Sequence, residues 1–249
     1  MSLNVLDIEA AAGRPSFCVI VPMYNEEDNT ERCIRTIHDF LSGLSLRTAI
    51  IAVDDGSSDR TGKILTELSA RYRDKLIVER HSGNRGYGAA NMTGSMRALK
   101  EGFDYALFMD ADLTQDLKYV YPFIEEMKKG TDFIKATRYS RRGGVEGVPF
   151  KRWIVSWVGN LLARAVLRLP LSDYTNGFRA VKVDLLARIR CTERGFAYLI
   201  EEVCQLTRHA KTYADVPYIL TVRQDNASKS KFNYSPNVYW AYLRHLFRK

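Results

Sequence analysis

The sequence is poor in the side chains that build disulfides and metal clusters, with four cysteines and four histidines in 249 residues. No two cysteines form a CxxC pair, and their apolar surroundings predict buried free thiols in a reducing cytoplasm. No spacing pairs the histidines, so surface or capping roles are expected for them. The residues concerned are Cys18, Cys33, Cys191 and Cys204, and His38, His81, His209 and His245.

Long apolar runs are also missing. No stretch of about 18 uncharged apolar residues occurs, so the sequence predicts no transmembrane helix. Residues 1–16 include Asp7 and Glu9 and lack the basic region that opens a secretory signal peptide. These absences favour a cytoplasmic protein, and a hydrophobic content of 46% is enough for a sizeable core.

Positive charge is concentrated in two regions. The net charge is +8, but residues 138–170 carry seven Lys or Arg and one acid, and residues 223–249 carry six and one. The rest of the chain is therefore net acidic, at −3. Such regional basicity favours a phosphate-rich ligand or an anionic membrane surface. Nucleic acid is not expected, because basic and aromatic residues are not interleaved as in RNA-binding modules, and +8 is modest for that role.

Short apolar runs alternate with segments of helical periodicity along the first half of the chain. The runs are residues 17–22, 48–53, 75–80, 105–109 and 132–137, and the helical segments between them are residues 25–44, 59–73, 86–102 and 117–130. This alternation predicts an α/β fold with a mostly parallel sheet flanked by helices. We expect a single domain over 1–249, with a regular half at 17–137 and a less regular half at 138–249.

Acidic side chains follow three of the predicted strands, in "MYNEE", "DDGSSD" and "DADLTQD", and the basic "RYSRR" follows another. For any one acidic strand end, a turn or a helix cap is as good an explanation as a ligand site. Three at one edge are harder to explain in this way, since ligands of open α/β sheets bind beyond the carboxyl ends of the strands. Asp110 and Asp112 can direct both carboxylates at one Mg²⁺ or Mn²⁺.

Such a metal would in turn hold a diphosphate. Mg²⁺ prefers one or two carboxylates and completes its shell with water and substrate phosphates, so two acids suffice if a diphosphate supplies the remaining oxygens. Arg138, at the neighbouring strand end, and the later Arg223 and Lys229 are candidates to meet the phosphate oxygens.

Several motifs occur in order along residues 21–180, namely "VPMYNEE", "DDGSSDRT", "NRGYGAANMTG", "DADL", "TRY" and "GGVEGVPFKRWIVSWVGNLLARAVLRLPLSDYTNGFRA". Together they resemble the GT-A-fold, family 2 glycosyltransferases, and most closely the dolichyl-phosphate mannose synthase and polyprenyl-phosphate glycosyltransferase group. The resemblance implies a Rossmann-like GT-A fold. It also implies inverting, metal-dependent transfer of a sugar from a nucleoside diphosphate sugar to a polyprenyl (dolichyl) phosphate. GDP-mannose and UDP-sugars both stay open as donors.

The resemblance also implies roles for individual residues. It places a nucleotide pocket at Pro22, Tyr24, Asn25 and Glu26, with Val53, Asp54 and Asp55 beside the base. It implies that metal and donor bind at Asp110, Ala111 and Asp112, and that phosphates are gripped by Arg138, Arg223 and Lys229. Arg152 and Ser156 would receive the acceptor phosphate, which makes the catalytic set Asp112, Arg138, Arg152 and Ser156.

Three positions depart from the family pattern. The family usually has Gln directly after "DADL" as a third metal ligand, whereas this chain has Thr114 there and Gln115 one step later. We expect Gln115 to complete the metal site, with Thr114 as the alternative. Asn226 stands where the family has Gly in "RxxGxSK", and Val148 stands where it has Trp in "EGWP".

The acceptor has two interpretations. A lipid monophosphate oxygen is already anionic near neutral pH and needs no strong base, whereas a saccharide hydroxyl does. Glu201 and Glu202 are candidates for that base, but a helical surface position or a core ion pair explains them more simply. A family 2 transferase with a saccharide acceptor is therefore the alternative, and a non-catalytic sugar-nucleotide binder is a distant one.

Residues 152–171 combine apolar and basic side chains at helical spacing, with Trp153 and Trp157 on the apolar stripe. The segment is either a packed helix with solvated arginines or an interfacial helix whose tryptophans reach the headgroups of an anionic lipid surface. The tail at 239–249, which contains Trp240, has the same character. With a polyprenyl acceptor, the second interpretation predicts peripheral association with the cytoplasmic face of a membrane.

Overall fold

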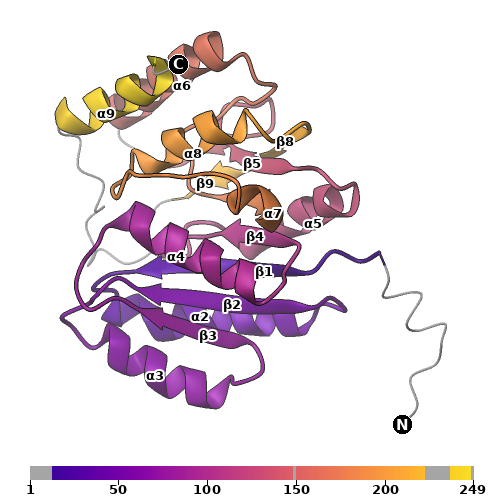
Figure 1. Ribbon diagram of the computed structural model, residues 1–249, viewed down its shortest axis with the longest axis vertical. Helices are drawn as coiled ribbons and strands as arrows, with labels where there is room; N and C mark the ends of the chain where they lie inside the picture. The colour runs from indigo at the N-terminus through magenta and orange to yellow at the C-terminus, as the bar shows by residue number, and fades with distance from the viewer. Residues whose placement is uncertain (1–12, 148–149, 222–235, 248–249) are drawn as a thin grey trace.

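Seven strands form the central sheet of the computed structural model, which describes residues 13–147, 150–221 and 236–247 (Figure 1). The strands of the chain are β1 (Phe17–Met23), β2 (Thr48–Asp54), β3 (Leu76–Arg80), β4 (Tyr105–Phe108), β5 (Phe133–Thr137), β6 (Gly144–Val145), β7 (Arg179–Lys182), β8 (Tyr213–Pro217) and β9 (Ile219–Leu220). The order in the sheet is β3-β2-β1-β4-β7-β5-β8, and β6 and β9 form a separate two-stranded sheet.

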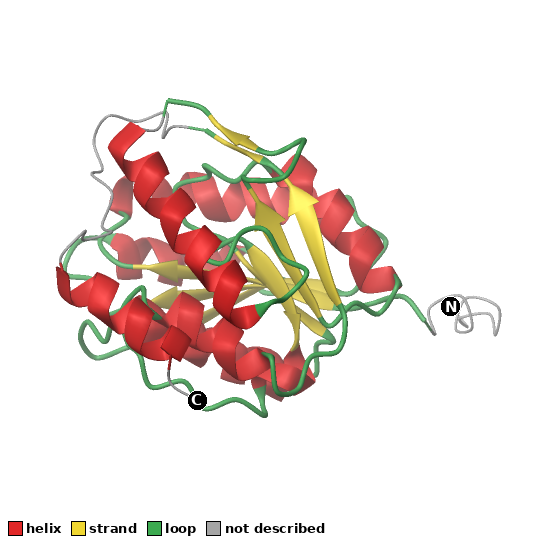
Figure 2. Ribbon diagram, turned by 90° about the horizontal axis from the view of Figure 1, so that it is seen from above, coloured by secondary structure: helices red, strands yellow, loops and turns green. Residues whose placement is uncertain are grey.

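Helices connect most of the strands and cover both faces of the sheet (Figure 2). They are α2 (Glu27–Ser42), α3 (Thr61–Arg71), α4 (Tyr87–Lys100), α5 (Val120–Lys128), α6 (Phe150–Leu167), α7 (Val183–Leu186), α8 (Tyr198–Leu206) and α9 (Pro236–Phe247), with a 3-10 turn, η1 (Leu117–Tyr119), before α5. In the described part of the chain, none of these helices has the length and apolar character of a membrane span.

The strands and helices predicted in the first half are confirmed, with small shifts at their ends. β1 and β2 are buried along their whole length apart from Pro22, as expected for parallel strands that are covered on both faces. β1 pairs in parallel with both β2 and β4, and β2 pairs in parallel with β3. The α/β class and the mostly parallel sheet are therefore as the sequence predicts.

The second half of the chain contributes more to the sheet than its sequence pattern suggests. β7 inserts between β4 and β5 and runs antiparallel to both, and β8 extends the sheet parallel to β5. The expectation that Arg138 follows a strand adjacent to that of Asp110 is therefore wrong, because β7 separates the two strands. Since β7 runs in the opposite direction, the segment before it, residues 173–178, reaches the same sheet edge as the carboxyl ends of the parallel strands.

The core has two layers, one on each face of the sheet. On one face α2, α3 and α5 pack against the strands, and Phe123 of α5 belongs to the same cluster as Val19 of β1. On the other face α4, α7 and α8 supply apolar side chains, and Val203 of α8 belongs to the same cluster as Ile20. Leu246 of α9 joins this second layer, so the C-terminal helix is anchored to the body of the domain.

The four cysteines are free thiols, as predicted, but only Cys18 and Cys33 are buried. Cys191 and Cys204 are half-buried, so the expectation of four buried thiols is wrong for these two. Burial raises the pKa of the Cys204 thiol to about 11, which keeps it protonated and unreactive near neutral pH.

Candidate active site at the carboxyl edge of the sheet

The carboxyl ends of the parallel strands gather most of the residues assigned from the sequence. Pro22 and Val53 are paired in register near the ends of β1 and β2. The loops beyond these strand ends carry Tyr24, Asn25 and Glu26 after β1, Asp55 after β2, Asp110, Ala111 and Asp112 after β4, and Arg138 after β5. The topology thus places the donor-side candidates at one edge, with Asp54 as the last residue of β2.

The loops after β1 and β2 are bonded to each other. The N–H of Asn25 donates to Ser57 Oγ at 3.0 Å, and the N–H of Ser58 donates to Asn25 Oδ1 at 2.9 Å. Asn25 has a φ of 50°, a left-handed conformation that Asn tolerates better than most residues. Glu26 is buried, and its N–H donates to Thr61 Oγ1 at 2.8 Å. These bonds fix the relative position of the two loops assigned to the nucleotide.

Asp54 and Asp55 are buried, and the Asp55 carboxylate anchors the loop before α4. The backbone N–H groups of Arg85 and Gly86 each donate to Asp55 at 2.8 Å, and Asp55 Oδ1 lies 2.6 Å from His81 Nδ1. Gly86 has a φ of 96°, which a side chain would strain. The Asp55 carboxylate therefore fixes the backbone of residues 85–86 at the edge of the site.

Two of the four histidines contradict the expectation of surface or capping roles. His81 and His245 are only 7% and 6% exposed. His81 bridges Asp55 and Thr93, with Nε2 lying 2.9 Å from Thr93 Oγ1, and His245 Nε2 lies 2.9 Å from Glu193 Oε1. The acidic partners lie 26 and 52 residues away along the chain, so no local spacing indicates these pairs.

Asp110 and Asp112 each have a partner in the loop after β4. Gln115 bonds Asp110 twice: its Oε1 accepts from the Asp110 N–H and its Nε2 donates to Asp110 Oδ2, both at 2.9 Å. The N–H and the Oγ1 of Thr114 both donate to Asp112 Oδ1, at 3.1 and 2.8 Å. Leu113 has a φ of 55°, so the chain turns sharply between them. Thr114 and Gln115, the two candidates for a third ligand, therefore each orient one aspartate.

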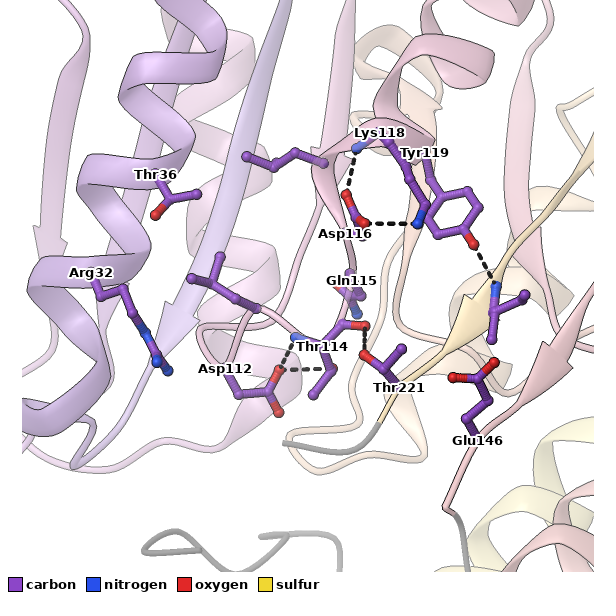
Figure 3. Close-up of a pocket in the computed structure, with 13 residues that line it drawn as sticks. Arg32, Thr36, Asp112, Thr114, Gln115, Asp116, Lys118, Tyr119, Glu146 and Thr221 are labelled. Atoms are coloured by element: carbon purple, nitrogen blue, oxygen red, sulfur yellow. Dashed lines mark hydrogen bonds and ion pairs between the residues drawn. The ribbon is translucent and has the colours of Figure 1, made fainter. Parts of the chain in front are cut away.

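A pocket of about 470 Å³ opens beside this loop (Figure 3). It is lined by Arg32 and Thr36 of α2, by residues 112–119, and by Glu146, Ile219 and Thr221. The Arg32 side chain extends toward Asp112 across the pocket (Figure 3). On the far side, Thr221 Oγ1 donates to the Thr114 carbonyl at 3.4 Å. The mixture of carboxylates, cations and hydroxyls suits a charged, hydroxylated ligand.

The donor atoms at the end of β4 fit a hard divalent cation. Carboxylate oxygens are the ligands that Mg²⁺ and Mn²⁺ prefer. Within the residues that the structure describes, no group of three or more His, Cys, Asp and Glu side chains is placed to hold a metal ion. A metal at Asp110 and Asp112 would therefore take its remaining oxygens from a ligand or water, which suits Mg²⁺ or Mn²⁺ rather than Zn²⁺.

Arg138 lies at the end of β5 in a dense polar cluster. Its Nε and Nη2 donate to the two carboxylate oxygens of Asp173, at 2.7 and 3.0 Å. Nη2 also lies 2.9 Å from Thr175 Oγ1 and 3.2 Å from Ser156 Oγ. Burial by itself would raise the pKa of the Asp173 carboxyl, but the Arg138 guanidinium outweighs this effect and holds the pKa below its usual value. The structure thus brings together two residues of the assigned catalytic set, Arg138 and Ser156.

The segment before β7 links this cluster to the acidic loop. At one end Asp173 contacts Arg138. At the other end, a Cβ added to Gly177 would lie 2.9 Å from the Tyr87 hydroxyl and 3.7 Å from both carboxylate oxygens of Asp110. The antiparallel insertion of β7 therefore places this segment between the ends of β4 and β5, in contact with both halves of the site.

Glu201 and Glu202 are held in structural contacts. Glu202 is fully buried, pairs through both oxygens with Arg179 at the start of β7, and accepts from the Tyr198 hydroxyl at 2.6 Å. Glu201 accepts hydrogen bonds from the N–H of Thr192 at 3.0 and 2.9 Å. The interpretation as a core ion pair is confirmed for Glu202, whereas a helical surface position is wrong for Glu201, which is only 5% exposed. Both carboxylates are thus occupied by bonds within the protein.

Several assigned positions lie outside the described residues. These are Arg223 and Lys229, together with the departures at Val148 and Asn226. Arg152 belongs to α6, and the structure describes its backbone only. The roles assigned to these side chains stay predictions.

Three residues around Arg138 and Ser156 are not predicted by the sequence pattern, namely Asp173, Thr175 and Asn160. Asn160 Nδ2 donates to Thr175 Oγ1 at 3.1 Å, and Asn160 Oδ1 accepts from the N–H of Tyr174. For Asp173 and Thr175 the available signal was the polar cluster "SDYTN" at 172–176, whereas Asn160 lies inside α6 and is not part of that cluster. The place of the cluster depends on the antiparallel strand β7, which the periodicity of the sequence did not reveal.

α6 and α9 pack against each other at the end of the molecule opposite α3 (Figure 1). Both helices expose large apolar side chains. These are Ile154, Val155, Trp157, Val158 and Leu161 on α6, and Trp240 and Phe247 on α9. Trp153 stacks on Trp157 with ring centroids 6.2 Å apart. Asn160 and Ala163 mark the buried side of α6, so the helix is packed on one side only.

Known proteins are similar to most of this chain. The model of glycosyl transferase family 2 matches residues 18–190. The chain is 32% identical over 232 residues to a dolichol-phosphate mannosyltransferase of Pyrococcus furiosus, and the alignment covers 92% of this chain and 62% of that protein. It is 28% identical over 214 residues to a polyprenol monophosphomannose synthase of Mycolicibacterium smegmatis, and that alignment covers 85% of this chain and 79% of that protein. The chain thus spans about three fifths of the first relative's length.

A solved structure supports the fold. Glucosyl-3-phosphoglycerate synthase from Mycobacterium tuberculosis, in complex with Mn²⁺, UDP and phosphoglyceric acid, matches with a TM-score of 0.66 at 19% identity, over 99% of this chain and 84% of that chain. At that identity the likeness bears on the fold alone, and it confirms the expected GT-A class. Since the family model runs from β1 to beyond β7, across the whole edge that carries the site, the chain belongs to glycosyl transferase family 2.

Proposed function

We propose that the chain catalyses inverting transfer of a sugar from a nucleoside diphosphate sugar to a polyprenyl (dolichyl) phosphate. The observation that carries the proposal is that the Asp110 carboxylate and the polar cluster around the Arg138 guanidinium flank one short segment, residues 173–178. The names of the two relatives support a polyprenyl or dolichol acceptor and favour mannose as the sugar. GDP-mannose is thus the first donor to test, ahead of UDP-sugars.

The donor would lie along the loops after β1 and β2. The nucleotide would contact Pro22, Tyr24, Asn25, Glu26, Val53, Asp54 and Asp55, as the family resemblance implies. Mutual hydrogen bonds already hold these loops together, and Asp55 holds the loop before α4. Little ordering of the chain would then be needed when the nucleotide binds, which favours affinity.

Asp110, Ala111 and Asp112 would hold Mg²⁺ or Mn²⁺ and the donor diphosphate, with Gln115 as the further ligand candidate. When bound, the metal neutralises charge on the departing diphosphate. The Mn²⁺ and UDP in the similar solved structure support a divalent metal. Within this chain, Gln115 and Thr114 keep the two carboxylates oriented at the end of β4. Arg223 and Lys229 are proposed to contact the same diphosphate.

The acceptor would attack through a phosphate oxygen. A new bond forms between that oxygen and the anomeric carbon, while the bond from the anomeric carbon to the diphosphate oxygen breaks on the opposite face, with positive charge developing on the sugar ring. The attacking oxygen is already anionic, so no proton has to be removed. Arg138, Arg152 and Ser156 would receive the acceptor phosphate. The engagement of Glu201 and Glu202 in structural bonds favours this acceptor over a saccharide hydroxyl, which would need a base.

We further propose that the chain reaches its acceptor by peripheral association with an anionic membrane surface on the cytoplasmic side. The exposed apolar side chains of α6 and α9 support this proposal, since Trp240 is 69% exposed and Leu161 55%. Arg164 and Arg168 are exposed on and just after the same helix and would meet lipid phosphates. A polyprenyl chain leaves the bilayer at a cost of about 0.8 kcal/mol per CH₂, so the enzyme has to come to the lipid.

A donor panel tests the proposal directly. GDP-mannose, UDP-glucose and UDP-GlcNAc, each radiolabelled in the sugar, are offered with a polyprenyl phosphate and Mg²⁺ or Mn²⁺, and label is followed into organic solvent. We expect one donor to transfer label to the lipid, with the anomeric configuration inverted. Label that reaches only added saccharides would establish the saccharide-acceptor alternative instead. Nucleotide binding without any transfer would support a non-catalytic sugar-nucleotide binder.

A further inference from the structure

The Arg138 guanidinium is hydrogen-bonded through Nε and Nη2, while the described residues leave its third nitrogen, Nη1, open. Nε donates to Asp173 Oδ2, and Nη2 donates to Asp173 Oδ1 and lies within hydrogen-bond distance of Thr175 Oγ1 and Ser156 Oγ. In the part of the chain that the structure describes, Nη1 has no hydrogen-bond partner, although the Arg138 side chain is only 14% exposed. Two hydrogens of a fixed cation are therefore left for a ligand.

Asp173 is itself fixed by its surroundings. It is fully buried, and its carboxylate also accepts from the backbone N–H groups of Arg138 at 3.3 Å and Thr175 at 3.2 Å. The pair is neutral as a whole, so Arg138 can remain at this place before any anion arrives. Asp173 thus sets the direction of the guanidinium rather than competing for the same hydrogens as a ligand.

Asn160 ties the same cluster to α6. It is 4% exposed, and its Nδ2 donates to the Ser156 carbonyl at 2.8 Å and to Thr175 Oγ1 at 3.1 Å. Its Oδ1 accepts from the N–H of Tyr174, which fixes the segment before β7. Thr175 Oγ1 lies 3.2 Å from Ser156 Oγ, so one hydroxyl connects the strand end, the helix and the segment.

We propose that Asp173, Thr175 and Asn160 are positioning residues that hold Arg138 and Ser156 as one preformed receptor for a phosphate monoester. The inference rests on the proposed function, which supplies the phosphate-bearing acceptor. Donors that are fixed in advance bind a phosphate without the loss of side-chain freedom that a mobile arginine would incur. The ligand would take the open Nη1 edge of Arg138 and the Ser156 hydroxyl, while the other three residues contact only protein.

Binding of inorganic phosphate tests the receptor without any turnover. The probe is the Arg138 Nε–H signal in nitrogen-15 NMR, followed as phosphate is added to full-length protein saturated with nucleoside diphosphate and Mg²⁺. We expect saturable shifts in the wild type and binding weakened about ten-fold or more in Asp173→Asn, since hydrogen bonds to a charged group would be lost. Thr175→Val should weaken binding similarly, and Thr175→Ser, which keeps the hydroxyl, should restore it.

The matched control is Asp132→Asn. Asp132 pairs with Lys182 at 2.8 Å directly before β5, at the opposite end of the strand from Arg138. A loss of stability alone would affect both aspartate variants, whereas loss of phosphate binding should be confined to Asp173→Asn. If Asp173→Asn does not fold, the Thr175→Val and Thr175→Ser pair still decides. Absence of phosphate binding at Arg138 in the wild type, or equal binding in Thr175→Val, overturns the inference.

Kinetics separate the inference from the function on which it rests. With a short, water-soluble prenyl phosphate, Thr175→Val should raise the KM for the acceptor about ten-fold and leave the KM for the donor unchanged, whereas a general structural defect would lower kcat without this selectivity. If no donor yields labelled lipid but phosphate still binds at Arg138 in a Thr175-dependent way, the proposed function fails and the receptor stands. If sugar transfer proceeds and Thr175→Val leaves the KM for the acceptor unchanged, the proposed function stands and the inference of a preformed receptor is refuted.

Discussion

Gln115 bonds both the backbone and the side chain of Asp110. Its Oε1 accepts from the Asp110 N–H and its Nε2 donates to Asp110 Oδ2, each at 2.9 Å, and Gln115 is only 3% exposed. One buried carboxamide therefore fixes the Asp110 carboxylate relative to its own backbone at the end of β4. The sequence suggested Gln115 as a metal ligand, but in the structure Gln115 orients another candidate metal ligand, Asp110.

Loss of this support should weaken metal binding. We expect Gln115→Leu to lower Mn²⁺ affinity about 10- to 100-fold, as measured by electron paramagnetic resonance with nucleoside diphosphate present. Gln115→Glu separates the two roles, because a direct ligand would tolerate or improve on the carboxylate, whereas an orienting residue would lose its donor to Asp110. Gln205→Leu is the control, since Gln205 bonds the backbone N–H and carbonyl of Arg190 in a similar way outside the site. Equal Mn²⁺ affinity in Gln115→Leu and Gln205→Leu would contradict the assignment.

The buried pair of Arg179 and Glu202 should dominate local stability. Both side chains are fully buried, and Arg179 also lies over the Phe108 ring at 3.8 Å. Glu202→Gln would leave a buried guanidinium without its counter-charge, so we expect the free energy of unfolding to fall by about 3–5 kcal/mol. Asp184→Asn is the matched control, because its pair with Arg188 is exposed and should contribute less than about 1 kcal/mol. Urea unfolding of both variants measures the difference. Similar losses of unfolding free energy in the two variants would show that burial of the Arg179–Glu202 pair does not determine its contribution to stability.

The sequence was sufficient to predict the first half of the fold. Strands such as β1 are continuous apolar runs, and α2 has apolar residues at helical spacing, so both patterns are strong. β7 was not found because it is only four residues long and lies in an irregular stretch. Its antiparallel direction is set by the packing of β4 and β5 on either side, which no local pattern encodes.

The candidate site was predictable where its residues are local. Asp110 and Asp112 follow one strand end, and the structure keeps them together with Thr114 and Gln115. The surroundings of Arg138 were not predictable in this way, because Asp173 comes from 35 residues away and reaches it only through the place of β7. Long-range pairing of this kind depends on topology, which the spacing of charged residues does not reveal.

Lys135 should make stability depend on pH. It is fully buried on β5 and donates to the Asn176 carbonyl at 2.7 Å, and burial, with the nearby Arg179 charge, lowers the pKa of its ammonium to about 7. In the unfolded chain that pKa returns to its ordinary value of 10.5, so between pH 7 and 10.5 the unfolded state binds a proton that the folded state lacks. The free energy of unfolding should therefore rise with pH in this window, by at most about 1.4 kcal/mol per unit from this residue.

Lys135→Met removes this contribution. We expect the variant to gain stability relative to the wild type most strongly below pH 7, and the gain to shrink as pH rises toward 10. Urea unfolding of both proteins at pH 6.5, 8 and 9.5 measures this, and the difference between the two proteins cancels the titration of all other groups. A difference that is independent of pH would mean that Lys135 keeps its proton in the folded protein.

The exposed apolar side chains of α6 and α9 should control access to a membrane-bound acceptor. We expect Trp157→Ser with Trp240→Ser to weaken sedimentation with anionic liposomes about ten-fold or more, since two large aromatic surfaces would no longer enter the headgroup region. Arg164→Glu with Arg168→Glu should weaken it through charge, and this loss should diminish at high salt because screening already reduces the attraction. Both double variants should slow transfer to a long-chain polyprenyl phosphate.

A matched double variant and a short acceptor distinguish membrane attachment from damage to the site. Met96→Ser with Leu99→Ser removes two apolar side chains on α4 that are 72% and 48% exposed but belong to a different surface, and it should leave liposome binding unchanged. All three double variants should transfer sugar to a short, water-soluble prenyl phosphate at the wild-type rate, because that acceptor needs no membrane. If Trp157→Ser with Trp240→Ser slows transfer to both acceptors equally, the tryptophans support the fold or the site. The apolar face would then have no part in lipid binding.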